Sequence, residues 1–262
     1  MRPAAVAGSF YPGDRDTLMR AVRGLLRSVA APEEDANPSP KALIAPHAGY
    51  VYSGSVAATA YAQFASLRGT VKRVLLAGPA HRVYLRGVAV PSVDAFDTPL
   101  GPVAVDAEAR RLALEVEGVA VNDEAHAAEH SVEVHLPFIL EALGPVLVLP
   151  MVVGGGPPTV LADILDRLWG GDETRIVIST DLSHYHDDAT ARRLDRATAG
   201  AIVARRWEDV GPQQACGAGP LRGLLLAAER RDLPVRLLEL RTSADTVGPP
   251  DRVVGYGAFT VG

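Results

Sequence analysis

Hydrophobic and polar positions along the chain follow two different periods. Leu18, Val22, Leu25 and Val29 recur at the spacing of one helical face, so residues 15–30 are expected to form an amphipathic helix. Further along, short continuous apolar runs predict buried strands, and the longer stretches between them have helical spacing. The pattern predicts strands near 41–45, 73–77, 87–91, 103–105, 146–153, 175–179, 234–241 and 252–260, and helices near 54–65, 107–117, 132–143, 158–169, 188–206 and 217–231.

Helical segments between buried strands are typical of parallel crossovers, with helices on both faces of one sheet. We therefore expect a single α/β domain over residues 1–262, built on a mixed, mostly parallel sheet. The direction of the two closing strands stays open, with an antiparallel placement as one possibility. The turn-rich segment 97–102 predicts a hairpin excursion, and the polar, proline-containing residues 31–40 predict a surface linker.

Composition and charge narrow the classes of function. The chain has 26 Lys and Arg residues against 31 Asp and Glu residues, which gives a net charge of −5. A surface that binds nucleic acid or an anionic membrane needs a basic field, so we expect neither partner. The single cysteine, Cys216, excludes an internal disulfide, and no apolar run approaches the roughly 18 residues of a membrane span. We expect a cytoplasmic protein.

Histidines gather just after the predicted strands. All seven histidines lie between residues 47 and 186. His47, His81 and the pair Asp181 and His184 each follow a different apolar run. Ligands of open α/β sheets bind outside the carboxyl ends of the strands, so parallel strands would bring these four side chains to one rim. This convergence predicts a functional site, although any one of these histidines could serve only as a hydrogen-bonding group in a loop.

A second concentration of ligand-capable groups lies at residues 126–135. We expect His130, Glu133 and His135 to line the site and His126 to be solvated. The histidines at 130 and 135 are five residues apart, which fits a single helical face poorly. The glutamate that precedes His130 fits a simple helix cap.

Cys216 stands near the start of a predicted helix. A thiol at a helix N-terminus tends to have a lowered pKa, which favours a thiolate ligand or nucleophile. A small buried residue with no chemical role is the alternative for a lone cysteine.

Other local patterns are less specific. Gly49 and Gly78 flank the histidines, where a side chain would obstruct the backbone. The glycine- and proline-rich residues 154–158 follow a strand but lack the spacing of nucleotide-binding loops. A hydrolytic set of Ser179, Ser183 and His184 is conceivable, but the sequence specifies no oxyanion hole for it.

Five motifs occur in order along the chain. They are residues 2–12 (RPAAVAGSFYP), 45–54 (APHAGYVYSG), 78–81 (GPAH), 129–138 (EHSVEVHLPF) and 179–185 (STDLSHY). Together with Cys216 and Gly217, these motifs resemble the Memo family, which in prokaryotes is called AmmeMemoRadiSam system protein B. The resemblance covers nearly the whole chain. It implies a fold similar to that of class III extradiol dioxygenases.

The resemblance also implies a metal site. Class III extradiol dioxygenases bind non-haem Fe(II) with two histidines and a glutamate, whereas the matching pocket of Memo proteins has two histidines and a cysteine. Carried over by motif, the ligands of this chain are His47, His81 and Cys216, holding one iron or copper ion per chain. A soft thiolate in place of a hard carboxylate favours copper or a thiolate-tolerant iron.

Further site residues follow from the same resemblance. His184 stands where the dioxygenases keep an acid/base histidine, and Asp181 matches another pocket residue of the family. His130 matches the His-rich segment, and we include it with these two as a candidate catalytic residue. Animal members carry a basic, histidine-containing stretch after the Cys-Gly pair, where this chain has Ala-Gly-Pro at 218–220. An anion-binding role of that segment is therefore not carried over.

Three functions remain open, and with them the question whether the protein is an enzyme. The first is metal-dependent redox chemistry on oxygen, a reduced oxygen species or an unknown small molecule. The second is a non-enzymatic module that binds a peptide or a protein. The family's prokaryotic name suggests an AMMECR1-type protein and a radical SAM protein as such partners. The third is an extradiol-type dioxygenase, which the thiolate disfavours.

Overall fold

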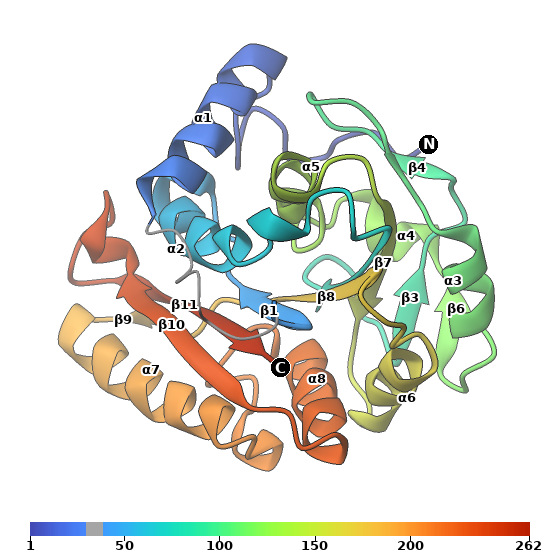
Figure 1. The fold of residues 1–262 in the computed structure, drawn as a ribbon. Helices are drawn as coiled ribbons and strands as arrows, with labels where there is room; N and C mark the ends of the chain where they lie inside the picture. The colour runs from blue at the N-terminus through green and yellow to red at the C-terminus, as the bar shows by residue number, and fades with distance from the viewer. Residues whose placement is uncertain (30–38) are drawn as a thin grey trace.

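The structure, a computed structural model, describes residues 1–29 and 39–262. Its centre is a sheet that combines segments from the whole chain (Figure 1). The strands are β1 (Ala42–Ala45), β2 (Arg73–Pro79), β3 (Val88–Val90), β4 (Ala95–Phe96), β5 (Val103–Ala104), β6 (Val119–Val121), β7 (Leu147–Val153), β8 (Thr174–Ser179), β9 (His184–His186), β10 (Val235–Thr242) and β11 (Val253–Val261).

The main sheet has the strand order β10-β11-β1-β8-β2-β7-β3-β6, and β9 pairs with β11. Its four central strands, β1, β8, β2 and β7, are parallel to one another. On either side of this centre, β11 pairs antiparallel with β1 and β10, and β3 pairs antiparallel with β7. The expected α/β fold with a mixed, mostly parallel sheet is therefore confirmed, and the closing strands are antiparallel.

Helices cover both faces of the sheet (Figure 1). One face carries α1 (Arg15–Ser28), α2 (Tyr50–Ala62), α4 (Asp123–Ala127) and α5 (Leu136–Leu143), and the other carries α3 (Ala107–Ala113), α6 (Thr159–Arg167), α7 (Asp188–Val203) and α8 (Ala218–Arg230). Among the described residues there are also short 3₁₀ turns, at η1 (Ala65–Leu67), η2 (Glu133–His135), η3 (Trp207–Asp209) and η4 (Ser243–Asp245).

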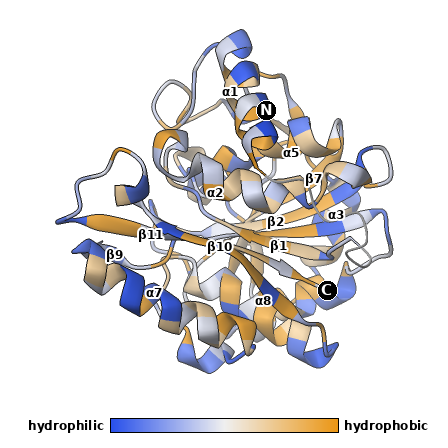
Figure 2. Cartoon of the chain, turned by 60° about the vertical axis from the view of Figure 1, so that its left-hand side comes forward, coloured by the Kyte–Doolittle hydropathy of each residue, from blue (hydrophilic) through white to orange (hydrophobic). Residues whose placement is uncertain are grey.

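Two hydrophobic cores result, one on each face of the sheet. Along β1, Leu43 and Ala45 belong to the core under α1 and α2, whereas Ala42 and Ile44 belong to the core on the opposite face. Successive side chains of a strand point to opposite faces, so a strand between two helical layers is apolar at every position. Figure 2 shows this as hydrophobic strands between helices whose outer surfaces are hydrophilic.

The first helix forms close to where its periodicity predicts. Asp14 accepts a hydrogen bond from the Thr17 amide (2.9 Å) and caps the N-terminus of α1. Leu18 and Val22 are buried beneath the helix, as expected from their spacing. Of the expected linker at 31–40, residues 31–38 lie outside the described part of the chain.

The shortest elements differ from the sequence-based expectation. The segment 97–102 does close a hairpin, but its partner strands are β4 and β5, while β3 belongs to the main sheet. The helix expected over 132–143 is divided into the 3₁₀ turn η2 and α5. The strands β4, β6 and β9 and the helix α4 were not expected, because two to five residues contain too little of either period.

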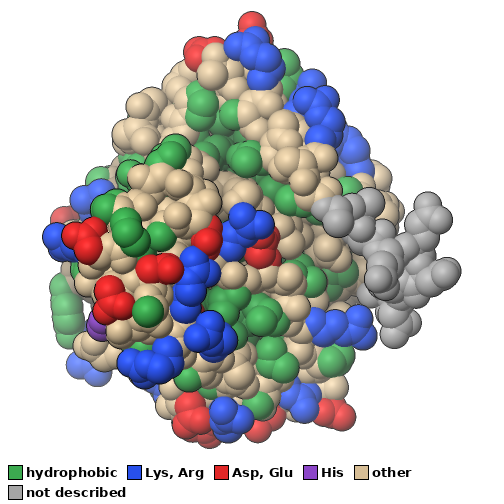
Figure 3. Space-filling model, turned by 90° about the vertical axis from the view of Figure 1, so that its left-hand side faces the viewer, with side chains coloured by type: hydrophobic (Ala, Val, Ile, Leu, Met, Phe, Trp, Pro, Cys, Tyr) green, Lys and Arg blue, Asp and Glu red, His purple; other side chains and the backbone are tan. Residues whose placement is uncertain are grey.

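Charged side chains of both signs share the surface. Figure 3 shows acidic and basic groups interleaved on one face of the molecule. Arg192, for example, donates to Asp188 (2.8 Å) and to Asp245 (2.7 Å). Within residues 1–29 and 39–262, no helix combines the length and the apolar character that crossing a membrane requires.

Candidate metal centre

Three residues of the site follow directly after three neighbouring strands of the sheet. His47, His81 and Asp181 each lie two residues beyond the end of β1, β2 and β8, respectively. These strands are adjacent and parallel in the order β1-β8-β2, so their carboxyl ends open onto the same rim. The imidazole centroids of His47 and His81 are 5.1 Å apart, and Asp181 Oδ1 accepts from the His47 amide (2.8 Å). The structure thus brings these three side chains together, as the strand pattern predicts.

Hydrogen bonding fixes the tautomer of His47. Its Nδ1 lies 2.6 Å from Ser179 Oγ, and that hydroxyl donates to the Ser131 carbonyl (2.6 Å). Since the hydroxyl proton is used, Ser179 Oγ accepts from Nδ1–H, and Nε2 keeps its lone pair. Nε2 lies 3.3 Å from Cys216 Sγ and 3.9 Å from Asp181 Oδ2. Burial lowers the pKa of His47 well below its usual value, which keeps this imidazole neutral.

Glu129 fixes the tautomer of His81 in the same sense. Glu129 Oε1 lies 3.0 Å from His81 Nδ1, and Oε2 accepts from the His81 amide (2.6 Å). Burial by itself would raise the pKa of Glu129, but hydrogen bonds from His81 and from the Ser131 amide outweigh it and lower the pKa to about 2. An ionised carboxylate can only accept, so His81 carries its proton on Nδ1 and leaves Nε2 as a ligand atom.

His130 adds a third imidazole. Its ring stacks on His81 at a centroid distance of 4.6 Å and meets His47 edge-on at 5.4 Å. Phe10, from the N-terminal segment, packs against the same ring at 4.7 Å. Burial lowers the pKa of His130 to about 4, so this imidazole is neutral at physiological pH. One nitrogen from each of the three histidines lies within 4.8 Å of the other two, which is close enough to share a cation.

The thiol of Cys216 lies beside Nε2 of His47. Cys216 Sγ accepts from the Asp181 amide (3.3 Å), and the two residues together with His47 form a second group whose ligand atoms lie within 4.8 Å. The next residue, Gly217, packs so tightly that a Cβ would lie 2.5 Å from the Ser179 carbonyl oxygen. A glycine is therefore required where the chain brings this thiol to the strand ends.

The pKa of Cys216 differs from the expectation based on its position before α8. Burial, with the Asp181 carboxylate as a smaller contribution, raises the pKa of this thiol to about 12. Hydrogen bonds with Thr180 and with the backbone of Asp181 and Gly217 lower this pKa by less than burial raises it. Without a cation beside it, Cys216 is a neutral thiol, whereas coordination to a metal ion displaces the thiol proton.

His47 belongs to both groups of ligand atoms, so the two groups meet at one imidazole. Neutral imidazoles and a thiol are the donors that copper, iron and zinc prefer in proteins. The family resemblance implies the ligand set His47, His81 and Cys216. This set combines His81 from the first group with Cys216 from the second, and His47 is common to both. Asp181 adds a carboxylate whose pKa burial raises to about 6. The donor set therefore fits a transition-metal ion.

His184 reaches the site from β9 rather than from a central strand. Its Nδ1 lies 2.8 Å from the Leu182 carbonyl oxygen, so Nδ1 carries the proton and Nε2 is an acceptor. The ring is part of neither group of ligand atoms described above. The following residue, Tyr185, has a φ of 66°, a conformation that is rare for an aromatic residue.

The structure gives Glu133 and His135 partners outside the two groups. Glu133 accepts hydrogen bonds from Arg2, from the Tyr11 hydroxyl (2.6 Å) and from two backbone amides of the N-terminal segment. His135 Nδ1 lies 3.0 Å from the Tyr61 hydroxyl, and both side chains are buried. Glu133 thus holds the N-terminal segment to the domain, and His135 is part of the core beneath α2.

The expectation that His126 is solvated is wrong. Its side chain is buried beside Phe96, and Nε2 lies 3.1 Å from the Ala89 carbonyl oxygen of β3. The short helix α4 packs against β3, and this contact turns the imidazole inward. Burial lowers the pKa of His126 to about 4.

Close backbone approach accounts for two glycine positions of the sequence. A Cβ on Gly78 would lie 2.7 Å from Ser131 Oγ, whereas one on Gly49 would make only ordinary contacts. In the glycine-rich turn after β7, a Cβ on Gly154 would lie 2.1 Å from the Leu85 carbonyl oxygen.

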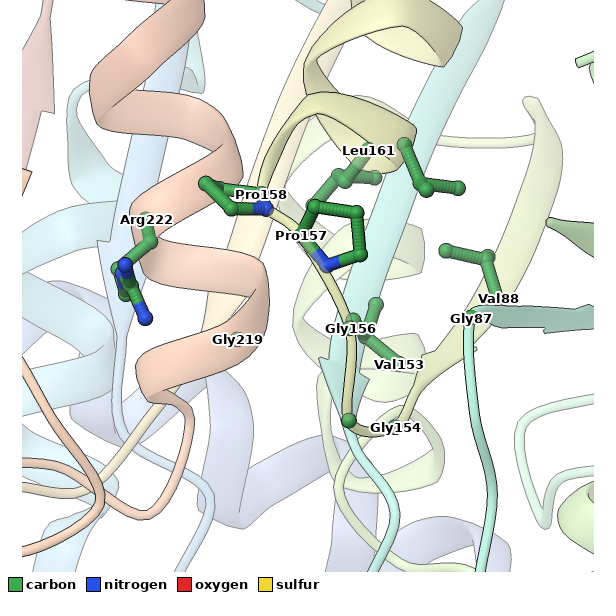
Figure 4. A pocket seen from close by; sticks show the side chains of 12 residues that line it. Gly87, Val88, Val153, Gly154, Gly156, Pro157, Pro158, Leu161, Gly219 and Arg222 are labelled. Carbon is green, nitrogen blue, oxygen red and sulfur yellow. The ribbon is translucent and has the colours of Figure 1, made fainter. Parts of the chain in front are cut away.

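Figure 4 shows the cavity at this turn, which glycine, proline and aliphatic side chains line together with Arg222. Its volume of about 20 Å³ has room for about one water molecule.

Two residues of the site were not found from the sequence. The local sequence suggests a hydrolytic residue for Ser179 and a helix cap for Glu129, yet both side chains orient a histidine. The one local signal for Glu129 is its position next to His130 in a motif. Its actual bond, to His81 at a separation of 48 residues, depends on the tertiary structure.

The fold and the site together define a class: an α/β protein whose candidate metal ligands lie at the carboxyl ends of parallel central strands. Within this class, the family model described as "Memo-like protein" matches residues 2–260, and the chain belongs to that family.

Relatives from several prokaryotes span nearly the full length of the chain. A "MEMO1 family protein" of Ignicoccus hospitalis is 34% identical over 98% of this chain and 97% of the relative. One of Thermotoga petrophila is 34% identical over 97% of both chains, and one of Desulfurococcus amylolyticus is 31% identical over 98% of both. Among solved structures, uncharacterized protein JW3007 of Escherichia coli K12 has a TM-score of 0.51 at 16% identity, covering 84% of this chain and 99% of that chain. This similarity shows a shared fold.

Proposed function

We propose that this protein binds one iron or copper ion through His47, His81 and Cys216. We further propose that it carries out redox chemistry there on oxygen, a reduced oxygen species or a small molecule. The observation that carries the proposal is the state of the two imidazoles. Both rings have Nδ1 engaged with an acceptor, Ser179 or Glu129, which leaves Nε2 of each ring as a lone-pair donor. The Nε2 of His47 lies 3.3 Å from the Cys216 thiol.

The donor set supports the choice of metal. Thiolate is a soft ligand and imidazole a borderline one, a combination that suits copper, iron or zinc better than magnesium or calcium. A bound iron or copper ion would supply one-electron chemistry at the strand ends. His130 and Asp181 lie close enough to complete the coordination or to contact a substrate.

The chain's own residues would handle protons beside the metal. Because burial raises the pKa of Asp181 to about 6, this carboxyl can take up and release a proton near neutral pH. His184 keeps its proton on Nδ1 and offers Nε2 as an acceptor. Asp181 also holds the His47 amide, so a change in its protonation would act on the backbone of a ligand.

A groove outside the metal site favours a second candidate, a module that binds a peptide or a protein partner such as an AMMECR1-type or radical SAM protein. The groove has a volume of about 720 Å³ and is lined in part by Phe10, Tyr11, Leu25 and Val51. Phe10 also packs on His130, so an occupant of the groove would contact a wall of the metal site.

The test is metal content by mass spectrometry on protein purified without oxygen and without chelator. Near-stoichiometric iron or copper is expected in the natural protein and its loss in Cys216→Ser and His81→Ala. His186→Ala is the matched control, because this exposed histidine of β9 belongs to neither ligand group. If the natural protein stays metal-free after loading with Fe²⁺ or Cu⁺, the redox proposal is wrong and partner binding becomes the function to test. A ring-cleavage product from catechols would instead identify an extradiol-type dioxygenase.

A further inference from the structure

Glu129 is a fully buried carboxylate whose hydrogen-bond partners all belong to one small region. Its side chain is 0% exposed. Oε2 accepts from the His81 amide (2.6 Å), and Oε1 lies 3.0 Å from His81 Nδ1. Oε1 also accepts from the amides of His130 and Ser131, both at 2.9 Å. Four donors therefore compensate the charge that the fold has buried here.

These bonds connect two loops that are far apart in sequence. His81 follows β2, whereas His130 and Ser131 lie between α4 and η2. Glu129 accepts hydrogen bonds from both the backbone amide and the ring of His81, so one carboxylate sets both the backbone position and the ring orientation of this histidine. A histidine held at two points has few rotamers left, which is the condition for a pre-organised ligand.

Glu129 also distinguishes between two stacked imidazoles. The rings of His81 and His130 are 4.6 Å apart, and Oε1 lies 3.3 Å from His130 Nδ1. Only the His81 ring forms a hydrogen bond with it, and His130 Nδ1 has no hydrogen-bond partner among the described residues. His47 differs from both, since its acceptor is the neutral hydroxyl of Ser179.

We propose that Glu129 is a positioning residue of the metal centre, which fixes His81 as an Nε2 donor and strengthens it as a ligand. The inference rests on the metal-binding role of His81 proposed above. An anionic acceptor on the far nitrogen holds the tautomer and raises the basicity of the ligand nitrogen, and removal of such a partner typically weakens metal binding 10- to 100-fold. His81 is thereby the more strongly polarised of the two ligand imidazoles, with His47 the weaker donor.

The decisive variant is Glu129→Gln, which keeps the size of the side chain and removes its charge. A glutamine cannot satisfy this site, because its NH₂ group must face either the His81 amide or the three donors around Oε1. Titration with Co²⁺, followed by the thiolate-to-metal charge-transfer absorption, should give an affinity 10- to 100-fold below that of the natural protein. Glu133→Gln is the matched control: it alters another buried carboxylate of the same segment, one that binds Arg2 and Tyr11. Its thermal stability should fall while its Co²⁺ affinity is unchanged.

A second measurement does not depend on metal binding. In the metal-free natural protein, at a pH at which the imidazole is neutral, ¹⁵N chemical shifts should show the His81 proton on Nδ1, whereas Glu129→Gln should give a mixture of tautomers. An unchanged His81 tautomer in Glu129→Gln, or equal losses of Co²⁺ affinity in the two variants, would overturn the positioning role. Absence of Co²⁺ binding in the natural protein would overturn the proposed metal function, and the tautomer measurement would still decide the role of Glu129.

Discussion

The Nε2 atom of His47 lies 3.3 Å from Sγ of Cys216, although 169 residues separate the two in the chain. His47 is placed by the end of a central strand, and Cys216 by the loop that leads into α8. Asp181 contacts both, since its carboxylate accepts from the His47 amide and its own amide donates to the thiol. The contact joins an imidazole and a thiol, two of the donors that the proposed metal site requires.

The raised pKa of Cys216 predicts slow alkylation. The thiolate is the reactive form, and with a pKa of about 12 only about one thiol in ten thousand is ionised at pH 8. Iodoacetamide should therefore modify the metal-free folded protein far more slowly than the urea-unfolded chain, which mass spectrometry measures directly. Equal rates in the folded and unfolded protein would show that the thiol is not held as the structure places it.

Buried neutral histidines predict acid sensitivity, and His126 gives a test away from the metal centre. Its pKa is about 4 in the folded protein against an ordinary value of 6.5, so the unfolded chain binds the extra proton first. The stability that depends on His126 is complete above pH 6.5 and is lost as the pH falls toward 4, by up to about 3 kcal/mol.

The measurement is the free energy of unfolding in urea at a series of pH values. His126→Leu should reduce the slope between pH 6.5 and 4 by close to one proton, whereas the exposed control His186→Leu should leave it unchanged. If the free energy of unfolding changes with pH at the same slope in His126→Leu and in the natural protein, the buried, neutral state of His126 is contradicted.

Two glycines should respond to alanine in opposite directions. Gly87 has a φ of +79°, and a Cβ there would lie 2.1 Å from the Gly118 carbonyl oxygen. Gly87→Ala should therefore lower the free energy of unfolding by about 2 kcal/mol or more, since both strain and a clash oppose it. Gly24 lies inside α1 with no described atom within 4 Å of its added Cβ, so Gly24→Ala should stabilise by about 0.5–1 kcal/mol. Chemical denaturation of both variants gives the comparison.

The N-terminal segment should depend on the buried pair of Arg2 and Glu133. Arg2→Ala leaves a buried carboxylate without its cation, a change that typically costs about 3–5 kcal/mol. Arg23→Ala removes a surface pair with Glu141 and should cost less than about 1 kcal/mol. The rate of amide hydrogen exchange in residues 2–12 should rise in Arg2→Ala and stay unchanged in Arg23→Ala. Protection that stays unchanged there would mean that the pair does not hold the segment.

Local sequence was sufficient for the framework of the fold and for part of the site. Strands such as β1 are apolar without interruption, and a helix such as α1 has both an N-cap and a helical period, so each element can be predicted from its own residues. Parallel neighbouring strands place their ends together as a matter of topology. His47, His81 and Asp181 could therefore be assigned to one rim before any contact was known.

The sequence by itself determined the α/β class, the family motifs and the strand ends at which ligand-capable side chains appear. Only the tertiary structure decided that His126 is buried, that Cys216 is a neutral thiol and that Glu129 bonds to His81 rather than only capping a helix. The physical reason is the range of the interactions. Periodicity and capping act within a few residues, whereas desolvation and hydrogen-bond partnership depend on which distant segments exclude water from a side chain and which donors they bring to it.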